Sequence, residues 1–233
     1  MAQIAPLGGP PLAHVTPPAR QSILKKPLFR VLRLFSGPSA RIDGLSAILN
    51  LIGCSCIDVD IENVGTHSLD QCDLSSDHLW NSLTTKVLHK EVTFVWMGTP
   101  CTTFSRARVG PPGPVALRAT DQIYGKHKST LSISDNEALR LGNYFALKSA
   151  EMAKTCLSVG VGFGIENPEP WPNSPSLFLL PELKTLSNNP LVHTIDFDQC
   201  TLGAETAKPT RILYSVIDLS HLGKRCNHKP QAW

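Results

Sequence analysis

Short apolar runs recur along the chain and are separated by polar or helix-type segments. Six of them are too short for helices and end near Gly, Pro or Asp, as buried strands do. They are residues 29–35, 54–60, 91–97, 159–167, 191–197 and 210–217. Apolar residues at helical spacing lie between these runs, in 42–52 and in 134–156, where Ser134 and Glu137 have capping-box spacing. This alternation predicts a parallel or mostly parallel α/β sheet.

Length and local composition indicate one folded domain with a less regular segment at each end. A chain of 233 residues suits a single domain, which we assign to 28–220. Residues 1–27 are rich in Pro and Gly without periodicity, and we expect a flexible Pro-rich arm there. Residues 221–233 form a predicted basic C-terminal tail. Within the domain, residues 106–132 hold five Lys or Arg against the single acid Asp121, which predicts a long basic loop.

Composition narrows the class of protein. Hydrophobic residues make up 42% of the chain, and no stretch approaches the roughly 18 apolar residues of a membrane-spanning helix. The N-terminal prolines and the lack of a basic residue before Arg20 do not fit a secretory signal. Seven cysteines, an odd number spread over the chain, indicate reduced thiols. We therefore expect an intracellular protein in a reducing compartment, with no metal site and no membrane partner.

Polar or conformationally special residues follow several predicted strands, at the edge where α/β sheets bind ligands. In chain order they are Phe35-Ser36-Gly37, Asp60, Asp73, Pro100-Cys101 and Glu166-Asn167-Pro168. Gly37 permits a tight turn, and an acid 23 residues later matches the position that binds a ribose. The GxGxxG run that a pyrophosphate needs is missing, which favours S-adenosylmethionine over NAD. The alternative is an ordinary glycine turn beside surface acids.

Cys101 directly follows Pro100 at a predicted strand end. A cysteine is usually a small buried apolar residue. Arg106 and Arg108 add weight to the alternative hypothesis of a reactive cysteine, because nearby positive charge favours the thiolate. Glu166 follows an apolar strand without a break, so we expect its carboxylate to be solvated at the sheet edge or used in chemistry. A thiolate and a carboxyl group can act together on a heteroaromatic ring, one adding to carbon while the other holds a ring nitrogen and an exocyclic amine.

These residues also carry a resemblance to a known family, the DNA cytosine-5 methyltransferases. RLFSGPSARIDGL resembles the family's first motif, VDIE its second and CDL its third. TPCTTFS resembles the nucleophile motif, GIENP the Glu-Asn motif, and LGAETAKPTRIL the later motif that normally reads Gln-x-Arg-x-Arg. The motifs occur in the family's order between Phe29 and Tyr214. The resemblance implies a Rossmann-like, S-adenosylmethionine-dependent methyltransferase fold with helices on both faces of the sheet.

The resemblance further implies a role for each matching residue. Cys101 would add to C6 of a cytosine flipped out of DNA, and Glu166 would contact N3 and the amino group, so that C5 takes the methyl group of S-adenosylmethionine. Asp60 would bind the cofactor ribose and Asp73 its adenine amine. The full cofactor-binding set is Phe35, Ser36, Gly37, Asp60, Asp73 and Pro100. Nucleic-acid contacts would come from Ser105, Arg106, Arg108, Arg118, Lys126 and Lys128.

Departures from the family pattern leave alternatives open. The Gln-x-Arg-x-Arg positions hold Thr206, Lys208 and Thr210, so Lys208 or the adjacent Arg211 would have to contact the cytosine carbonyl. No segment long enough for the family's target-recognition region follows, so we expect low sequence selectivity or a partner chain that supplies recognition. The alternatives are methylation of RNA by the same chemistry, a non-catalytic nucleic-acid-binding or partner-activating module, and a different cysteine-dependent transferase.

Overall fold

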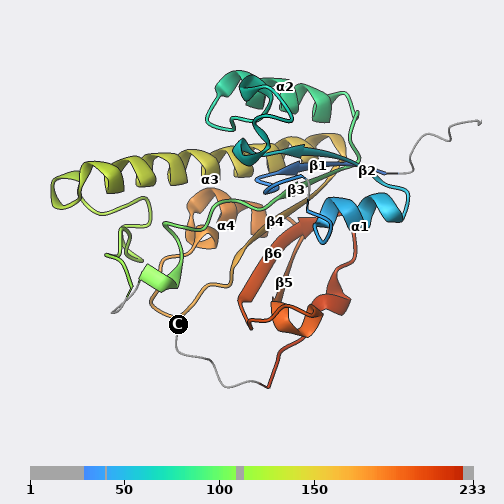
Figure 1. The fold of residues 1–233 in the computed structure, drawn as a ribbon. Coiled ribbons are helices and arrows are strands. Elements are labelled where there is room, and N and C mark those ends of the chain that lie inside the picture. The colour runs from blue at the N-terminus through green and yellow to red at the C-terminus, as the bar shows by residue number, and fades with distance from the viewer. Residues whose placement is uncertain (1–28, 40, 109–112, 228–233) are drawn as a thin grey trace, which may run out of the picture.

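The computed structural model describes residues 29–39, 41–108 and 113–227, which form one six-stranded sheet with helices packed on it (Figure 1). The predicted arm 1–27 lies outside the described residues. The strands are β1 (Arg30–Leu34), β2 (Ser55–Val59), β3 (Phe94–Met97), β4 (Gly162–Pro168), β5 (Val192–Asp198) and β6 (Pro209–Ser215). The helices are α1 (Leu45–Leu51), α2 (Asp77–Leu88), α3 (Ile133–Val159) and α4 (Pro181–Ser187). Each apolar run noted in the sequence holds one strand.

The sheet is mixed, so the prediction of a mostly parallel sheet is wrong. Its strand order is β2-β1-β3-β4-β6-β5, in which β1 to β4 run parallel and β6 is antiparallel to both of its neighbours. The cause is the connection between the last two strands. Residues 199–208 contain only the short 3₁₀ helix Gln199–Leu202, and a connection without a crossover helix joins antiparallel strands.

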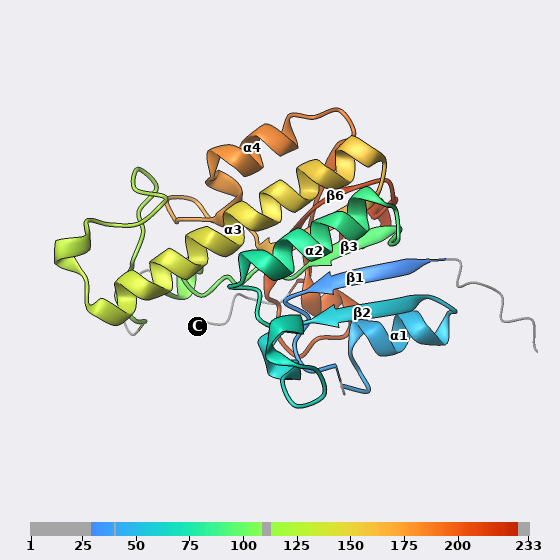
Figure 2. The same ribbon diagram turned by 90° about the horizontal axis from the view of Figure 1, so that it is seen from above.

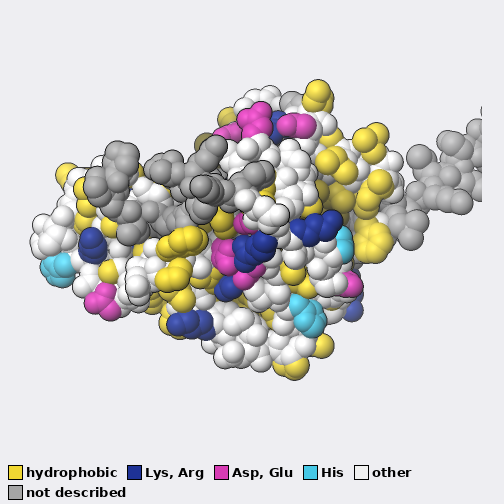
Figure 3. All heavy atoms as spheres, turned by 90° about the horizontal axis from the view of Figure 1, so that it is seen from below, with side chains coloured by type: hydrophobic (Ala, Val, Ile, Leu, Met, Phe, Trp, Pro, Cys, Tyr) yellow, Lys and Arg dark blue, Asp and Glu magenta, His cyan; other side chains and the backbone are white. Residues whose placement is uncertain are grey.

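The two faces of the sheet are covered unequally. Helices α2, α3 and α4 lie on one face and enclose the larger hydrophobic core (Figure 2). On the opposite face α1 packs against β2, and the described residues place no other α-helix there. A smaller cluster of Phe197, Ile212 and Tyr214 lies on that face. Figure 3 views the molecule from that side, where hydrophobic side chains are exposed.

Helix α3 begins after Ser132, whose hydroxyl accepts a hydrogen bond from the Asp135 N–H at 3.1 Å. The capping pair therefore lies two residues before the predicted pair of Ser134 and Glu137. The helix ends at Gly160, which adopts a left-handed conformation with φ of 72°. Although α3 has 27 residues, no helix in the described part of the chain is long and apolar enough to cross a membrane.

The sequence analysis does not predict helix α2, although the helix has apolar residues at helical spacing. Leu79, Leu83 and Val87 recur at helical spacing and are all buried against the core. The indole N–H of Trp80 donates to the Leu74 carbonyl at 2.7 Å and holds the chain that enters the helix.

The strand order reverses between β1 and β3. From β1 the chain passes to β2 on one side, and it later returns to place β3 on the other side. Ligands of open α/β sheets bind at such a switch point, beyond the carboxyl ends of the strands. Because β1, β2, β3 and β4 are parallel, the segments that follow them meet at this one edge.

Candidate active site

The turn after β1 forms the first part of the edge site. Phe35 and Gly37 both have left-handed backbone conformations, with φ of 57° and 69°, and Ser36 lies partly buried between them. The Gly37 N–H donates to Asp60 Oδ2 at 2.9 Å, and the Glu62 N–H donates to Asp60 Oδ1 at 3.0 Å. A Cβ added to Gly37 would meet no atom within 4 Å, so the space over this turn is open. The structure thus joins the glycine turn to the acid that follows β2.

Asn63 braces the same turn and was missed by sequence reasoning. Its Oδ1 accepts the Ser39 N–H at 2.7 Å, and its Nδ2 donates to the Gly37 carbonyl at 3.3 Å. Only 3% of Asn63 is exposed. An asparagine three positions beyond a strand-terminal acid has no motif of its own, so only the fold reveals this contact.

Phe35 and Asp73 extend the site toward α2. The Phe35 ring packs on Trp80 and Phe145, with centroid separations of 6.2 and 5.2 Å. Asp73 lies in the turn before α2, where its Oδ1 accepts the Ser75 N–H at 2.8 Å, and it remains partly exposed. The cofactor roles of these residues stay predictions.

The turn that carries Cys101 is held to two other elements. The Asn167 amide donates to the Thr99 carbonyl at 2.6 Å, which ties the turn to β4. The hydroxyl groups of Thr99 and Ser149 lie 2.8 Å apart, which ties it to α3. Pro100 and Cys101 are both partly exposed at the edge. The two family-like motifs, Pro-Cys and Glu-Asn, are therefore in direct contact through Asn167.

A pocket of about 250 Å³ opens beside Cys101. Residues from the turn that carries Cys101, the end of β4 and the approach to β6 form its walls. They include Cys101, Phe104, Ser105, Pro168, Trp171 and Lys208. Pockets for drug-sized ligands are generally larger, so this one suits a single ring.

Burial raises the pKa of the Cys101 thiol above its ordinary value. Lys208 acts against this and Glu166 adds to it, both by charge and both less than burial. Arg108 is not among the groups that shift the pKa of Cys101, and its guanidinium donates to the carbonyls of Thr102 and Val115 at 2.8 and 3.1 Å. The cation that acts on the thiol is thus Lys208, and the expectation of a favoured thiolate is wrong for the free protein.

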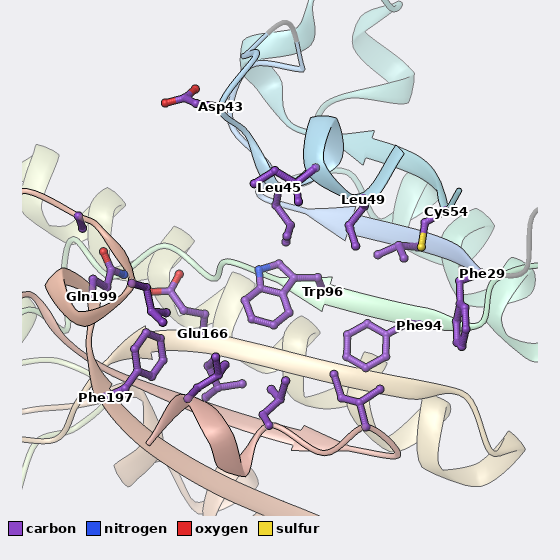
Figure 4. Close-up of a pocket in the computed structure, with 18 residues that line it drawn as sticks. Phe29, Asp43, Leu45, Leu49, Cys54, Phe94, Trp96, Glu166, Phe197 and Gln199 are labelled. Atoms are coloured by element: carbon purple, nitrogen blue, oxygen red, sulfur yellow. The ribbon is translucent and has the colours of Figure 1, made fainter. Parts of the chain in front are cut away.

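Lys208 connects Cys101 with Glu166. It lines the Cys101 pocket, and its Nζ lies 3.5 Å from Glu166 Oε1. Glu166 itself lies at the end of a larger groove on the α1 side of the sheet (Figure 4). The pocket and the groove therefore meet at this ion pair. Lys208 also has a positive φ of 27°, and strained backbone in a non-glycine residue is common at functional sites.

Arg211 does not approach Glu166, so the structure gives no support to its predicted role at the cytosine carbonyl. Glu166 is paired with Ile212 across the β4–β6 ladder, and adjacent residues of a strand point to opposite faces. Arg211 therefore points to the other face, where its Nε and Nη2 each donate to Asp196 at 2.7 Å. Of the two substitutes considered for the family's arginines, only Lys208 lies at the site.

Arg118 is a structural residue, which contradicts its predicted contact with nucleic acid. It is 2% exposed, and its guanidinium lies 3.7 Å from the centroid of the Phe104 ring. It donates to Asn143 Oδ1 at 2.7 Å and to Thr103 Oγ1 at 2.9 Å. Burial lowers its pKa to about 10. Arg118 thus fastens the loop after Cys101 to α3.

The other predicted nucleic-acid contacts are placed as follows. Ser105 lines the Cys101 pocket, and its hydroxyl accepts the Ala107 N–H at 3.2 Å. The side chain of Arg106 lies outside the described residues. Lys126 is partly exposed and Lys128 exposed, near the start of α3, and nothing in the structure tests their role.

Part of the predicted basic tail packs on the site. The Arg225 guanidinium donates to both carboxylate oxygens of Glu169, at 2.7 and 2.8 Å, and Glu169 lines the Cys101 pocket. The Cys226 N–H donates to Asp198 Oδ2 at 2.9 Å. Arg225 is thus engaged within the chain. Within the described ranges, His, Cys, Asp and Glu side chains form no group of three or more that could hold a metal ion.

Comparisons with known proteins give distant structural similarity. No family model matches the chain, and no curated protein does. A crystal structure of the S. pombe Dnmt2 methyltransferase has 16% sequence identity and a TM-score of 0.44, with 81% of this chain and 51% of that chain covered. A putative DNA modification methyltransferase encoded within an E. coli prophage has 16% identity and a TM-score of 0.40, with 81% and 46% covered. The chain spans about half the length of these proteins.

Proposed function

We propose that this chain transfers a methyl group from S-adenosylmethionine to C5 of cytosine in DNA, through a covalent adduct on Cys101. One observation carries the proposal. The Cys101 thiol borders a pocket of about 250 Å³, and Lys208 joins that pocket to Glu166 by a 3.5 Å contact. The arrangement lies at the switch point of the sheet, beside the turn braced by Asp60.

The turn after β1 fits a nucleoside without a phosphate. The space over Gly37 is open, and the Asp60 carboxylate next to it has lone pairs beyond those taken by two N–H groups. Arg33, a buried cation of β1, is already bonded to Asp58 and to the Ser36 carbonyl. An acid without a free cation suits a ribose and disfavours a pyrophosphate. On this proposal Phe35, Gly37, Asp60, Asp73 and Pro100 hold S-adenosylmethionine.

The proposed chemistry begins at the thiolate of Cys101. Its Sγ forms a bond to C6 of cytosine, and the electron pair of the C5–C6 double bond moves to C5, while Glu166 holds N3 and the amino group. S-adenosylmethionine would supply an electrophilic methyl group: as C5 bonds to the methyl carbon, the S–CH3 bond would break and its electron pair would stay on sulfur, leaving S-adenosylhomocysteine. C5 would then lose its proton to solvent water, and the electron pair of that C–H bond would restore the double bond and expel Sγ as thiolate. Cytosine must leave the base stack for this chemistry, as in other enzymes that modify a base.

Lys208 has two tasks in this proposal. Its charge offsets part of the rise in the Cys101 pKa that burial causes. A ring bound in the pocket would also place a carbonyl oxygen within reach of the same ammonium group. For this contact the ammonium group turns from Glu166 toward the pocket. The 3.5 Å separation is longer than that of a strong charge-assisted hydrogen bond, so little is lost in turning.

One observation favours a second function, a non-catalytic nucleic-acid-binding module. Burial raises the pKa of Cys101, so most of the thiol is protonated at neutral pH in the free protein. A protonated, partly buried cysteine is a poor nucleophile. Under this alternative the chain binds S-adenosylmethionine or nucleic acid and transfers nothing.

Incubation of the full chain with methyl-labelled S-adenosylmethionine separates the two functions. Duplex DNA and single-stranded RNA are offered in parallel, because the same chemistry serves RNA, and the products are digested to nucleosides for mass spectrometry. The proposal expects label in 5-methyldeoxycytidine. Label in 5-methylcytidine alone would change the substrate to RNA, and binding of S-adenosylmethionine without any transfer would support the non-catalytic module.

A further inference from the structure

A large apolar groove lies on the face of the sheet opposite α2, α3 and α4 (Figure 4). It has a volume of about 750 Å³ and runs between α1 and the segments that flank β5 and β6. Its floor is formed by side chains of β1, β3 and β6, because α1 covers only the β2 side. Among the described residues, nothing fills this groove. Large contiguous apolar surfaces are uncommon on soluble monomers, and they usually mark binding sites.

Four aromatic side chains line the groove, namely Phe29, Phe94, Trp96 and Phe197. Leu45, Ile48, Leu219 and Leu222 complete its apolar walls from the two sides. Proline-rich chain in the polyproline II conformation docks on surfaces of this kind, because its rings pack on aromatic faces and little conformational entropy is lost.

We propose that the segment of residues 1–28 of the same chain occupies this groove. The segment joins the described structure at Phe29, which itself lines the groove. It contains six prolines, Pro6, Pro10, Pro11, Pro17, Pro18 and Pro27, and apolar residues such as Ile23 and Leu24 close to the junction. The occupant is thus covalently attached at the groove's edge, which gives it a high effective concentration there.

The charges of the segment and of the groove are compatible. The charged residues that line the groove are the acids Asp43 and Glu166. Residues 1–28 carry Arg20, Lys25 and Lys26 and no acidic residue. Both acids are already paired within the chain, Asp43 with Arg41 and Glu166 with Lys208, so charge permits this docking and the apolar contacts select it.

The segment is long enough to cover the groove. Strand β4, whose Glu166 marks the far end, has seven residues and spans roughly 23 Å. Polyproline II chain rises about 3.1 Å per residue, so about eight residues cover this length and 28 residues exceed it several-fold. A docked segment would pass close to Glu166. The proposal concerns packing and holds whether or not the chain transfers methyl groups.

Photo-crosslinking in the full-length protein tests the docking. A photoreactive p-benzoylphenylalanine replaces Leu24, and peptide mass spectrometry locates its crosslinks after irradiation of the monomer. We expect intramolecular crosslinks to peptides that contain Trp96, Ile48 or Leu219. The matched control places the same probe at Val115, an exposed residue of the basic loop, which should not reach these peptides. Crosslinks from position 24 only between two molecules, or to no groove peptide, would overturn the proposal.

A second measurement uses Cys54, which lines the groove. In the full chain, the double substitution Ile23→Asp and Leu24→Asp should release the segment, and alkylation of Cys54 by a maleimide should become about five- to tenfold faster. Cys56 lies in β2 and does not line the groove, so its rate is the internal control. The substituted residues precede the described strands in sequence, so no residue of the sheet is changed. An unchanged Cys54 rate in the double variant would overturn the proposal.

Discussion

The polar groups on the two sides of the switch point are bonded differently. On the β1–β2 side, Gly37, Asp60 and Asn63 are joined by hydrogen bonds of 2.9 to 3.3 Å within the chain. On the β3–β4 side, Lys208 and Glu166 form one ion-pair contact of 3.5 Å, and Lys208 and Cys101 line the same pocket. The first side is a prearranged cradle, and the second keeps charges that a substrate can still engage. On the proposed function, the first side would hold the ligand and the second would act on it.

Replacement of the nucleophile should have the largest effect. Cys101→Ser should lower methyl transfer to DNA by at least about a thousandfold, because a hydroxyl group at neutral pH cannot replace a thiolate in adding to C6. Affinity for S-adenosylmethionine, measured by calorimetry, should stay within about twofold, since Cys101 lies outside the Gly37–Asp60 cradle. The matched control is Cys54→Ser, which leaves the pocket intact. Equal loss in the control would remove Cys101 from its assigned role.

Removal of the buried Arg118 guanidinium should destabilise the packing of the loop after Cys101 on α3. Arg118→Met should lower the free energy of unfolding by about 2–4 kcal/mol, because Asn143 and Thr103 lose a buried partner. Urea denaturation followed by circular dichroism measures this. If Arg118 contacted phosphates, the variant would keep its stability and the salt dependence of DNA binding would weaken.

Loss of the Lys208 charge should have a smaller effect, confined to the nucleophile side. In Lys208→Met the pKa of Cys101 should rise further, because the cation that lowers it is gone. Alkylation of Cys101 by iodoacetamide at pH 8 should slow about three- to tenfold, and its pH profile should move to higher pH. Lys208→Arg should restore most of the rate, and Lys224→Met, at an exposed lysine, should leave it unchanged.

A change in the cradle should have the smallest effect and should spare the thiol. Asp60→Asn keeps the shape but leaves one acceptor oxygen for the N–H groups of Gly37 and Glu62, so one of these two hydrogen bonds is lost and affinity for S-adenosylmethionine should fall about three- to tenfold. Asp70→Asn is the control, an exposed acid of the same region. The pH profile of Cys101 alkylation should be unchanged in both variants. A shifted profile in Asp60→Asn would mean that the two sides are not separate.

Sequence reasoning identified the strands and the residues at their ends, because apolar runs and the residue types that stop them are local features. It could not give the direction of β6, since an apolar run reads the same in a parallel and an antiparallel strand. Arg118 was misassigned because basic residues in a polar loop give no sign of burial. That property depends on Phe104 and Asn143, which lie distant in sequence and close in space.

The site shows the same limit. The motifs paired Cys101 with Glu166, but the nearby arginines suggested a lowered thiol pKa, whereas burial raises it. Burial follows from tertiary packing and not from neighbours in sequence. The choice between Lys208 and Arg211 likewise depended on which face of β6 each side chain takes, and only the β4–β6 register decides that.

Covalent trapping is the sharpest test of whether Cys101 adds to cytosine. The full chain is incubated with S-adenosylmethionine and DNA that contains 5-fluorocytosine, in which fluorine replaces the proton whose loss would release the enzyme. We expect a denaturation-resistant adduct, located by mass spectrometry on the peptide that contains Cys101 and absent in Cys101→Ser. An adduct on another cysteine, or no adduct from protein that binds both S-adenosylmethionine and DNA, would contradict it.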